Sequence, residues 1–148
     1  MAVNRAELIE CLNDLIQTCR ESESEFQSAA DRVKDPELRR LFSTCSVQRA
    51  QFASELASEV RQLGGKPSKM GTVSTALHHG LMNIKSSVTG KSDEAIIEEC
   101  VRAEDAAVEN YQRVLKQNLP PNVLPVAKHQ FTEIKRSHDR IRGLEKAA

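Results

Sequence analysis

Apolar residues recur at alternating spacings of four and three along four long segments of this 148-residue chain. The first of these series is Leu8, Leu12, Leu15, Cys19, Ser22, Phe26, Ala29 and Val33. Residues three and four apart share one face of a helix, so the pattern is typical of amphipathic helices that pack together. The chain has the length of one ordinary domain. The sequence therefore predicts an all-α four-helix bundle formed by residues 1–148 as a single domain.

Capping and helix-breaking residues predict where these helices begin and end. Asn4 and Glu7 can form a capping box at the start of the first helix. Asp35 can cap the second helix, with Pro36 at its first position, and Gly64 is suited to end it. The predicted helices span about residues 4–33, 36–63, 93–118 and 121–146.

The connection between the second and third long helices, about residues 64–92, exceeds what a turn in a bundle requires. Apolar residues within it predict a short amphipathic helix over about 72–88. A segment of this length can cross the whole bundle, which would let the second and third long helices run parallel. An up-down-up-down bundle with a side excursion is the alternative topology.

Composition argues against several classes of function. Lys and Arg number 21, Asp and Glu also number 21, and only one Tyr, four Phe and no Trp are present. A chain without a basic stripe or stacking aromatics is not expected to bind nucleic acid. No apolar run is long enough for a membrane span, and the N-terminus lacks the apolar region of a secretion signal, so a cytoplasmic protein is expected. Cys19, Cys45 and Cys100 fall at inward positions and form no C-x-x-C motif, which predicts buried, reduced thiols.

A charged residue interrupts the apolar series of the third long helix, at Glu104. Counting residues from a common end of the bundle places Ser22, Arg49 with its neighbour Gln48, and His138 in about the same layer. A buried ionised glutamate is costly unless it is paired or neutralised. The sequence therefore predicts a buried polar layer in which Glu104 pairs with Arg49 or His138.

The same layer is where a four-helix bundle can hold a di-metal site, built from one Glu on each of two helices and a Glu-x-x-His motif on each of the other two. Glu104 and His138 match parts of this pattern, while Lys135 stands where the Glu of a Glu-x-x-His motif would be. Glu23 and Glu25 flank the layer on the first helix. The candidate metal ligands are therefore Glu104 and His138, with iron or another first-row metal as the alternative to a bundle that has no cofactor.

Several stretches resemble an uncharacterised bacterial family of four-helix bundles, which is assigned to the ferritin-like class as a domain of unknown function. The stretches that carry the resemblance are LNDLIQTC (12–19), VKDPELRRLF (33–42), RQLGGKP (61–67), SSVTGKSDEAIIEECVRAEDAAVENY (86–111) and SHDRIRGL (137–144). The resemblance implies a ferritin-like bundle with one crossover between the second and third long helices. Of the ligand pattern of the ferritin-like class, it carries over only Glu104 and His138.

Three functions follow as hypotheses. The first is a non-enzymatic bundle that acts in stress physiology or as an interaction module, as a monomer or a homo-oligomer, with no catalytic residue identified. The alternative is a metal-binding ferritin-like protein or di-iron oxidase with a degenerate site. A third hypothesis, a small-ligand carrier, depends on a cavity beside the small inward residues Ser22, Ala29, Ala107 and Ala127.

Overall fold

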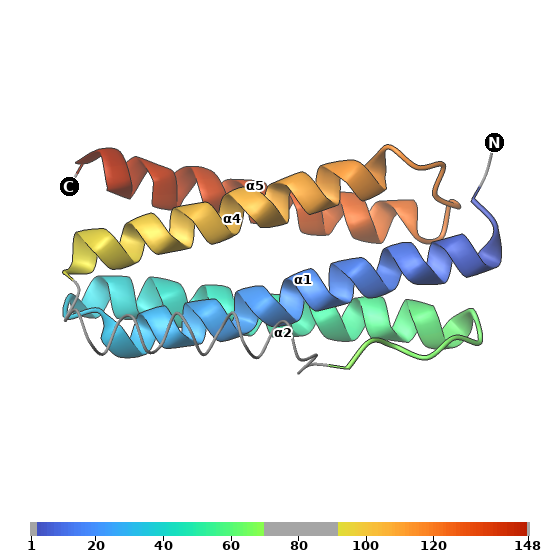
Figure 1. Cartoon of the computed structure of the whole chain (residues 1–148), viewed down its shortest axis with the longest axis horizontal. Helices are drawn as coiled ribbons and strands as arrows, with labels where there is room; N and C mark the ends of the chain where they lie inside the picture. The colour runs from blue at the N-terminus through green and yellow to red at the C-terminus, as the bar shows by residue number, and fades with distance from the viewer. Residues whose placement is uncertain (1–2, 70–91, 148) are drawn as a thin grey trace.

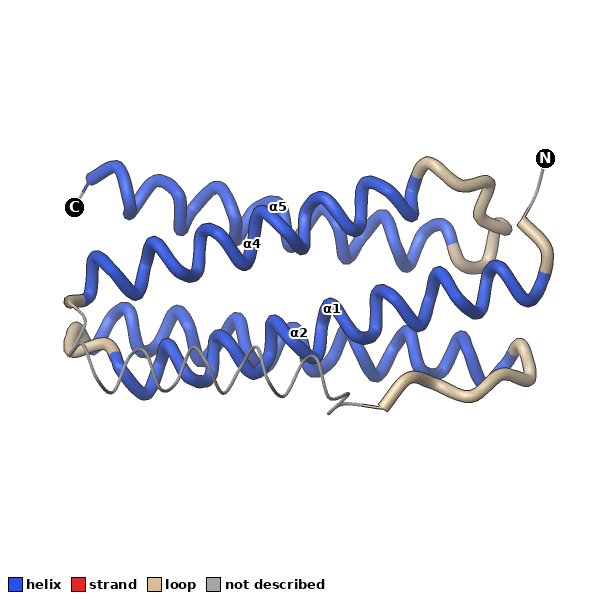
Figure 2. The backbone as a smooth tube through the Cα atoms, in the orientation of Figure 1, coloured by secondary structure: helices blue, strands red, loops and turns tan. Residues whose placement is uncertain are grey.

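The computed structural model describes residues 3–69 and 92–147, which form four long helices (Figure 1). Their bounds are α1 Arg5–Arg32, α2 Pro36–Gln62, α4 Asp93–Leu115 and α5 Leu124–Ala147. Each bound differs by three residues or fewer from the predicted range. The described residues contain helices and loops and no strand (Figure 2), so the all-α prediction is confirmed. The short helix predicted over about 72–88 lies outside the described residues.

Side-chain caps begin the helices where the sequence predicts them. The Asn4 side chain accepts a hydrogen bond from the backbone N–H of Glu7 at 2.8 Å, and Glu7 accepts one from the Asn4 amide in return. Asp35 caps α2 by accepting from the Glu37 N–H at 2.9 Å, with Pro36 as the first helical residue. These contacts satisfy backbone donors that have no partner within the helix. At the other end of α2 the chain turns through Gly64, whose φ of +80° is the left-handed conformation that favours glycine.

The helix directions show a bundle in which α2 and α4 run parallel. The Asp93 carboxylate, at the start of α4, accepts hydrogen bonds from the backbone N–H groups of Lys34 and Asp35 at 2.8 and 3.0 Å. These two residues precede α2, so α2 and α4 begin at the same end of the molecule (Figure 1). The end of α2 at Gln62 and the start of α4 at Asp93 therefore lie at opposite ends of the bundle. This arrangement favours the one-crossover topology over the up-down-up-down alternative.

The apolar interior falls into two clusters, one toward each end of the bundle. The first is built on α1 from Leu8 to Cys19 and includes Tyr111 and Ile134. The second is built on α1 from Phe26 to Val33 and includes Phe42 and Ile141. On each of the four helices one residue of the predicted polar layer lies between the two clusters: Ser22, Arg49, Glu104 and His138. All four are buried, which confirms the predicted break in the apolar core.

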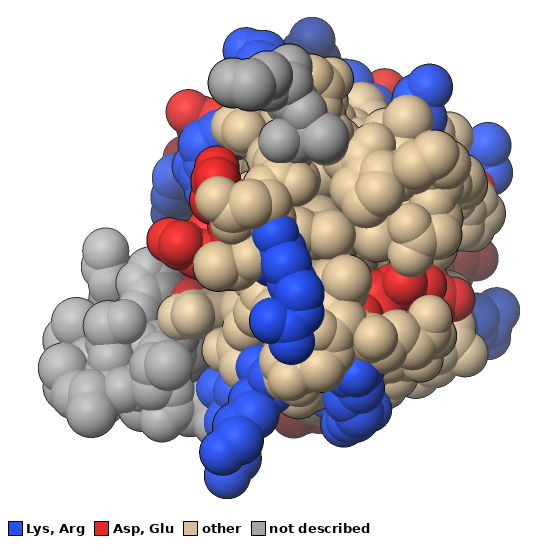
Figure 3. Space-filling view, turned by 90° about the vertical axis from the view of Figure 1, so that its right-hand side faces the viewer, with Lys and Arg blue, Asp and Glu red and all other residues tan. Residues whose placement is uncertain are grey.

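The surface carries charges of both signs. On the end of the bundle drawn in Figure 3, basic and acidic side chains are interspersed among neutral ones. Among the described residues, no helix is both long and apolar enough to cross a membrane. The buried polar layer of Ser22, Arg49, Glu104 and His138 is the candidate functional site.

Candidate functional site

At the centre of the bundle, Arg49 of α2 and Glu104 of α4 form a two-pronged ion pair. Nη1 of Arg49 lies 2.5 Å from Oε1 of Glu104, and Nη2 lies 2.8 Å from Oε2. Both side chains are inaccessible to solvent, at 0% and 1% exposure. This geometry matches the planar fork of a guanidinium to the two oxygens of a carboxylate. Glu104 thus points into the core because a buried arginine meets it there.

The Nε nitrogen and the flat face of the Arg49 guanidinium also have partners. Its Nε donates to Oε1 of Gln48 at 3.3 Å, and its Cζ lies 5.2 Å from the centre of the Phe26 ring. A cation over an aromatic face is attracted by the ring, more strongly when water is excluded. Burial of the guanidinium acts to lower the pKa of Arg49, but the hydrogen bonds and negative charge of Glu104 outweigh it and the pKa is raised. Arg49 therefore stays charged in the core.

His138, the other candidate metal ligand, has different partners. Its Nε2 lies 2.6 Å from Oδ1 of Asp105, and its Nδ1 lies 3.0 Å from Oδ1 of Asp139. Asp105 also faces Arg142, whose Nη1 is 3.7 Å away. Ionised carboxylates only accept hydrogen bonds, so the ring makes both contacts when it carries both protons. His138 thus joins α5 to α4 at the edge of the layer through Asp105, a residue adjacent to Glu104.

The pKa of the Asp139 carboxyl is lowered by its neighbours on α5. A hydrogen bond from Lys135, at 2.7 Å, and a second from His138 hold the pKa of the Asp139 carboxyl below its ordinary value. Asp139 itself is exposed to solvent. The lowered pKa keeps Asp139 available as an anion for the His138 ring.

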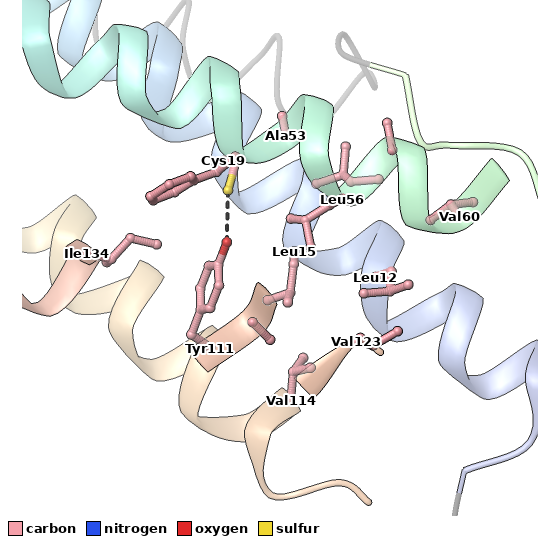
Figure 4. Close-up of a cluster of buried hydrophobic side chains, with 14 of the residues drawn as sticks. Leu12, Leu15, Cys19, Ala53, Leu56, Val60, Tyr111, Val114, Val123 and Ile134 are labelled. Atoms are coloured by element: carbon pink, nitrogen blue, oxygen red, sulfur yellow. Dashed lines mark hydrogen bonds between the residues drawn. The ribbon is translucent and has the colours of Figure 1, made fainter. Parts of the chain in front are cut away.

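A second buried polar network, which the sequence pattern did not predict, joins the four described helices. The Tyr111 hydroxyl donates to Oε1 of Gln130 at 2.7 Å. It also lies 3.1 Å from the Cys19 sulfur, the contact drawn as a dashed line in Figure 4. Nε2 of Gln130 in turn donates to the backbone carbonyl of Phe52 at 3.3 Å and to Oε1 of Glu55 at 2.9 Å. Because the Tyr111 proton is given to Gln130, the Cys19 thiol is the donor in the remaining contact. The network thus connects α1, α4, α5 and α2 in turn.

The apolar series of the fourth helix reads Leu124, Ala127, Phe131 and Ile134, so the sequence predicts Phe131 at the inward position. In the structure Gln130 is fully buried and Phe131 is only half-buried. An amide is an unusual residue for a core position, and the only available signal was that Gln130 lies three residues after the inward Ala127 and four before Ile134. Helix periodicity is almost equally compatible with Gln130 and with Phe131 at the inward position.

The cysteines are buried as predicted, apart from Cys11, which the sequence left unassigned and which is half-buried. All four are free thiols. Burial raises the pKa of the Cys19 thiol to about 11, and burial raises that of Cys100 further. The thiolate is the reactive form of cysteine, so these side chains are poor nucleophiles. They pack as small apolar residues.

A di-metal centre does not fit the residues at the middle of the bundle. Both oxygens of Glu104 are taken by Arg49, and the second buried acid of α4, Glu99, accepts from Nη1 of Arg32 at 3.0 Å. Glu23, which flanks the layer on α1, pairs with Arg20 at 3.0 Å. Within residues 3–69 and 92–147, no group of three or more His, Cys, Asp or Glu side chains is placed to hold a metal ion. The positive charge facing Glu104 is supplied by a guanidinium.

The small inward residues do not by themselves mark a ligand cavity. Ala29, Ala107 and Ala127 are 2% exposed or less and belong to the two apolar clusters. One hollow, of about 680 Å³, lies between α1 and α2 and is open to the surface. Its walls are formed by Arg20, Glu23, Gln27, Ser46, Val47, Ala50, Gln51, Ser54 and Glu55.

Comparison with solved structures identifies the fold. The chain superposes on a two-domain protein from Anabaena variabilis with DJ-1/ThiJ/PfpI-like and ferritin-like domains, with a TM-score of 0.77 and 13% identity. The match covers 99% of this chain and 38% of that protein. It also superposes on the bacterioferritin of Desulfovibrio desulfuricans, described as having a diiron site, with a TM-score of 0.70 and 21% identity over 98% of this chain and 84% of the other. A conserved hypothetical protein from Mycobacterium tuberculosis matches with a TM-score of 0.76 and 11% identity over 98% and 95% of the two chains.

At these identities the structural matches show a ferritin-like bundle and leave the chemistry open. No curated protein matches the sequence. A family model described as "Domain of unknown function (DUF2383)" matches residues 7–117. These residues include most of α1 and all of α2 and α4, with both members of the central ion pair. The chain therefore belongs to the DUF2383 family, and its fold is that of a ferritin-like four-helix bundle.

Proposed function

We propose that this protein is a non-enzymatic ferritin-like bundle that works as a binding module, with an arginine–glutamate pair in place of a metal centre. The observation that carries the proposal is the two-pronged contact between Arg49 and Glu104, which leaves neither carboxylate oxygen of Glu104 without a strong donor. A metal ion at this position would have to displace a fully buried guanidinium from its buried counter-ion, Glu104. We further propose a cytoplasmic location, where buried free thiols stay reduced.

The second candidate function is metal binding through Glu104 and His138, with iron or another first-row metal. Its support is the shared fold with a bacterioferritin that is described as having a diiron site. In that case Arg49 would swing away from Glu104, and His138 would exchange Asp105 for the metal. The present contacts of these side chains do not favour such a site, so it stands behind the metal-free bundle.

Metal analysis separates the two functions. Protein purified without chelators would be assayed for bound first-row metals and then titrated anaerobically with ferrous ion. The metal-free module is expected to retain no stoichiometric metal and to show no saturable ferrous binding. About one equivalent of iron per chain, with a plateau in the titration, would refute the proposal.

Two variants test whether Glu104 and His138 are the ligands of any iron that binds. Glu104→Ala removes the candidate ligand but also leaves Arg49 buried without its partner, so loss of binding in this variant alone would be ambiguous. His138→Gln removes the other candidate ligand and keeps the Arg49–Glu104 pair intact. Saturable binding that both variants abolish, in protein that still melts cooperatively, would establish Glu104 and His138 as ligands.

A further inference from the structure

The exposed face of α2 differs from the other helix surfaces in its lack of charge. Between Arg40 and Glu55, the exposed residues are Thr44, Val47, Gln51 and Ser54. Val47 is 60% exposed and is the one large hydrophobic side chain found exposed among the described residues. The exposed residues of α4 are, by contrast, mainly charged. Depletion of charge is the compositional mark of an interface core.

These uncharged residues form one continuous stripe with charges of opposite sign at its two ends. At 100° per residue, Arg40, Thr44, Val47, Gln51, Ser54 and Glu55 fall within a sector about 100° wide. Arg40 and Glu55 are 15 residues apart, which is about 22 Å along the helix. The stripe therefore has a basic end, a neutral middle and an acidic end.

A stripe with this order of charges is complementary to itself when reversed. An antiparallel second copy of α2, related by a two-fold axis between residues 47 and 48, places Arg40 opposite Glu55 of the partner subunit at both ends. The same operation sets Thr44 opposite the partner subunit's Gln51 and brings the two Val47 side chains together near the axis. Closed two-fold dimers use one self-complementary patch on both subunits in this way.

We infer that the α2 face from Arg40 to Glu55 binds a second copy of this chain in an antiparallel two-fold dimer. The hollow between α1 and α2 borders the stripe and shares Val47, Gln51 and Ser54 with it, which gives the partner helix a recess in which to pack. The contact is centred on one helix face of about four turns, so it is smaller than a standard interface. A dimer that dissociates on dilution is therefore expected. The surface lies apart from the Arg49–Glu104 pair, so the metal titration does not bear on this inference.

Sedimentation velocity over a series of protein concentrations tests the inference with the full chain. Wild type is expected to shift from monomer to dimer as the concentration rises. Val47→Glu places two like charges at the axis and is expected to weaken the dimer more than about tenfold. Ala106→Glu, on the exposed face of α4, adds the same charge elsewhere and is expected to leave the dimer unchanged. A monomer at every concentration, or a dimer that Val47→Glu does not weaken, would overturn the inference.

Charge exchange tests the antiparallel geometry. Arg40→Glu alone and Glu55→Arg alone each place like charges together and are expected to weaken the dimer. The double variant restores opposite pairs and is expected to recover much of the loss. Single variants that weaken the dimer without recovery in the double variant would overturn the antiparallel arrangement.

Cross-linking gives a readout that does not depend on Glu55, whose side chain also accepts a hydrogen bond from Gln130. In a background with Cys11→Ser, Val47→Cys is expected to form a disulfide-linked dimer on mild oxidation, because the two residues meet near the axis. Ala106→Cys is expected to remain unlinked under the same conditions. Equal linkage at both positions, or none at position 47, would contradict the proposed axis.

Discussion

Arg49 is the residue on which the centre of this bundle depends. It is fully buried, yet every polar group it carries toward the core finds a partner in Glu104 or Gln48, and its flat face covers Phe26. A buried ion pair of this kind adds little net stability over an apolar pair, because the desolvation of both charges offsets their attraction. Its effect is specificity, since each helix register other than the native one would leave a charge buried alone.

A double-mutant cycle on the pair tests this account. Arg49→Met and Glu104→Leu are each expected to lower the free energy of unfolding by about 3–5 kcal/mol, because each leaves one buried charge uncompensated. The double variant is expected to lose much less than the sum of the two and to approach wild type. Urea denaturation followed by circular dichroism measures all four free energies.

The control for this cycle is the exposed pair of Arg102 and Glu98 on α4, whose side chains are 61% and 59% exposed. Arg102→Met is expected to change the free energy of unfolding by less than about 1 kcal/mol. The account is wrong if the Arg49 and Glu104 variants lose no more free energy of unfolding than this control. It is also wrong if the two losses simply add in the double variant.

Tyr111 is the second residue whose polar group acts within the core. Tyr111→Phe removes the hydroxyl between Cys19 and Gln130, and it leaves the buried Gln130 carbonyl oxygen without its donor. Loss of a partner for a buried polar atom is expected to cost about 1–3 kcal/mol in the free energy of unfolding, again measured with urea. Thr132→Val removes an exposed hydroxyl that bonds Lys128 on the same helix, and it serves as the control that should stay near wild type. An unchanged free energy of unfolding in Tyr111→Phe would mean that water donates to the Gln130 carbonyl oxygen instead.

At the scale of the elements, one side chain ties the start of α4 to the turn between α1 and α2. The Asp93 carboxylate accepts from the backbone N–H groups of Lys34 and Asp35, while Ser92 caps α4 itself by accepting from Ala95 at 3.3 Å. Asp93 thus performs for a neighbouring turn the function that an N-cap performs for its own helix. It fixes where α4 begins relative to α2, and hence the register in which Glu104 meets Arg49.

Asp93→Ala is therefore expected to destabilise the protein by about 1–2 kcal/mol, because two backbone donors lose their acceptor. Hydrogen exchange is expected to speed up most at Lys34 and Asp35. Glu94→Ala, one residue along in the same first turn and exposed to solvent, removes a similar helix-dipole charge without these contacts. Similar amide hydrogen exchange at Lys34 in Asp93→Ala and Glu94→Ala would show that Asp93 does not hold the turn between α1 and α2.

At the scale of the whole molecule, buried thiols predict how stability changes with pH. Burial raises the pKa of the Cys19 thiol from its ordinary value of 9.0 to about 11, and burial also raises the pKa values of Cys45 and Cys100. Above pH 9 the unfolded chain therefore loses these protons while the folded protein still holds them. The folded state binds more protons in that range, so stability falls as the pH rises.

The expected result is a decline in the urea midpoint from pH 9 upward, through the folded pKa of about 11. Cys19→Ser keeps a donor toward Tyr111 and removes the titrating thiol, so its decline between pH 9 and 11 should be shallower than that of wild type. Cys11→Ser, at a half-buried position, is the control and should change the slope less. An identical slope in wild type and Cys19→Ser would show that the thiol does not titrate with unfolding.

The local features of this structure could be predicted from the sequence alone. Helix starts at Asn4 and Pro36, the turn after α2 and the break in the apolar core at Glu104 all follow from interactions within a few residues or from simple periodicity. The resemblance to a ferritin-like family of unknown function was likewise carried by the sequence and is confirmed. These features need no knowledge of which helix packs against which.

The choice of partners was decided by the tertiary structure. Periodicity placed Glu104, Arg49 and His138 in one layer, but it could not tell which of them would bond, because the outcome depends on rotation of each helix by a few tens of degrees. The structure turns Arg49 onto Glu104 and turns His138 toward Asp105 and Asp139. It also buries Gln130 in preference to Phe131, against the sequence prediction. Sequence alone therefore determined the helices and the level of the polar layer, whereas the packing of four helices decided that an arginine, and not a histidine, faces the buried glutamate.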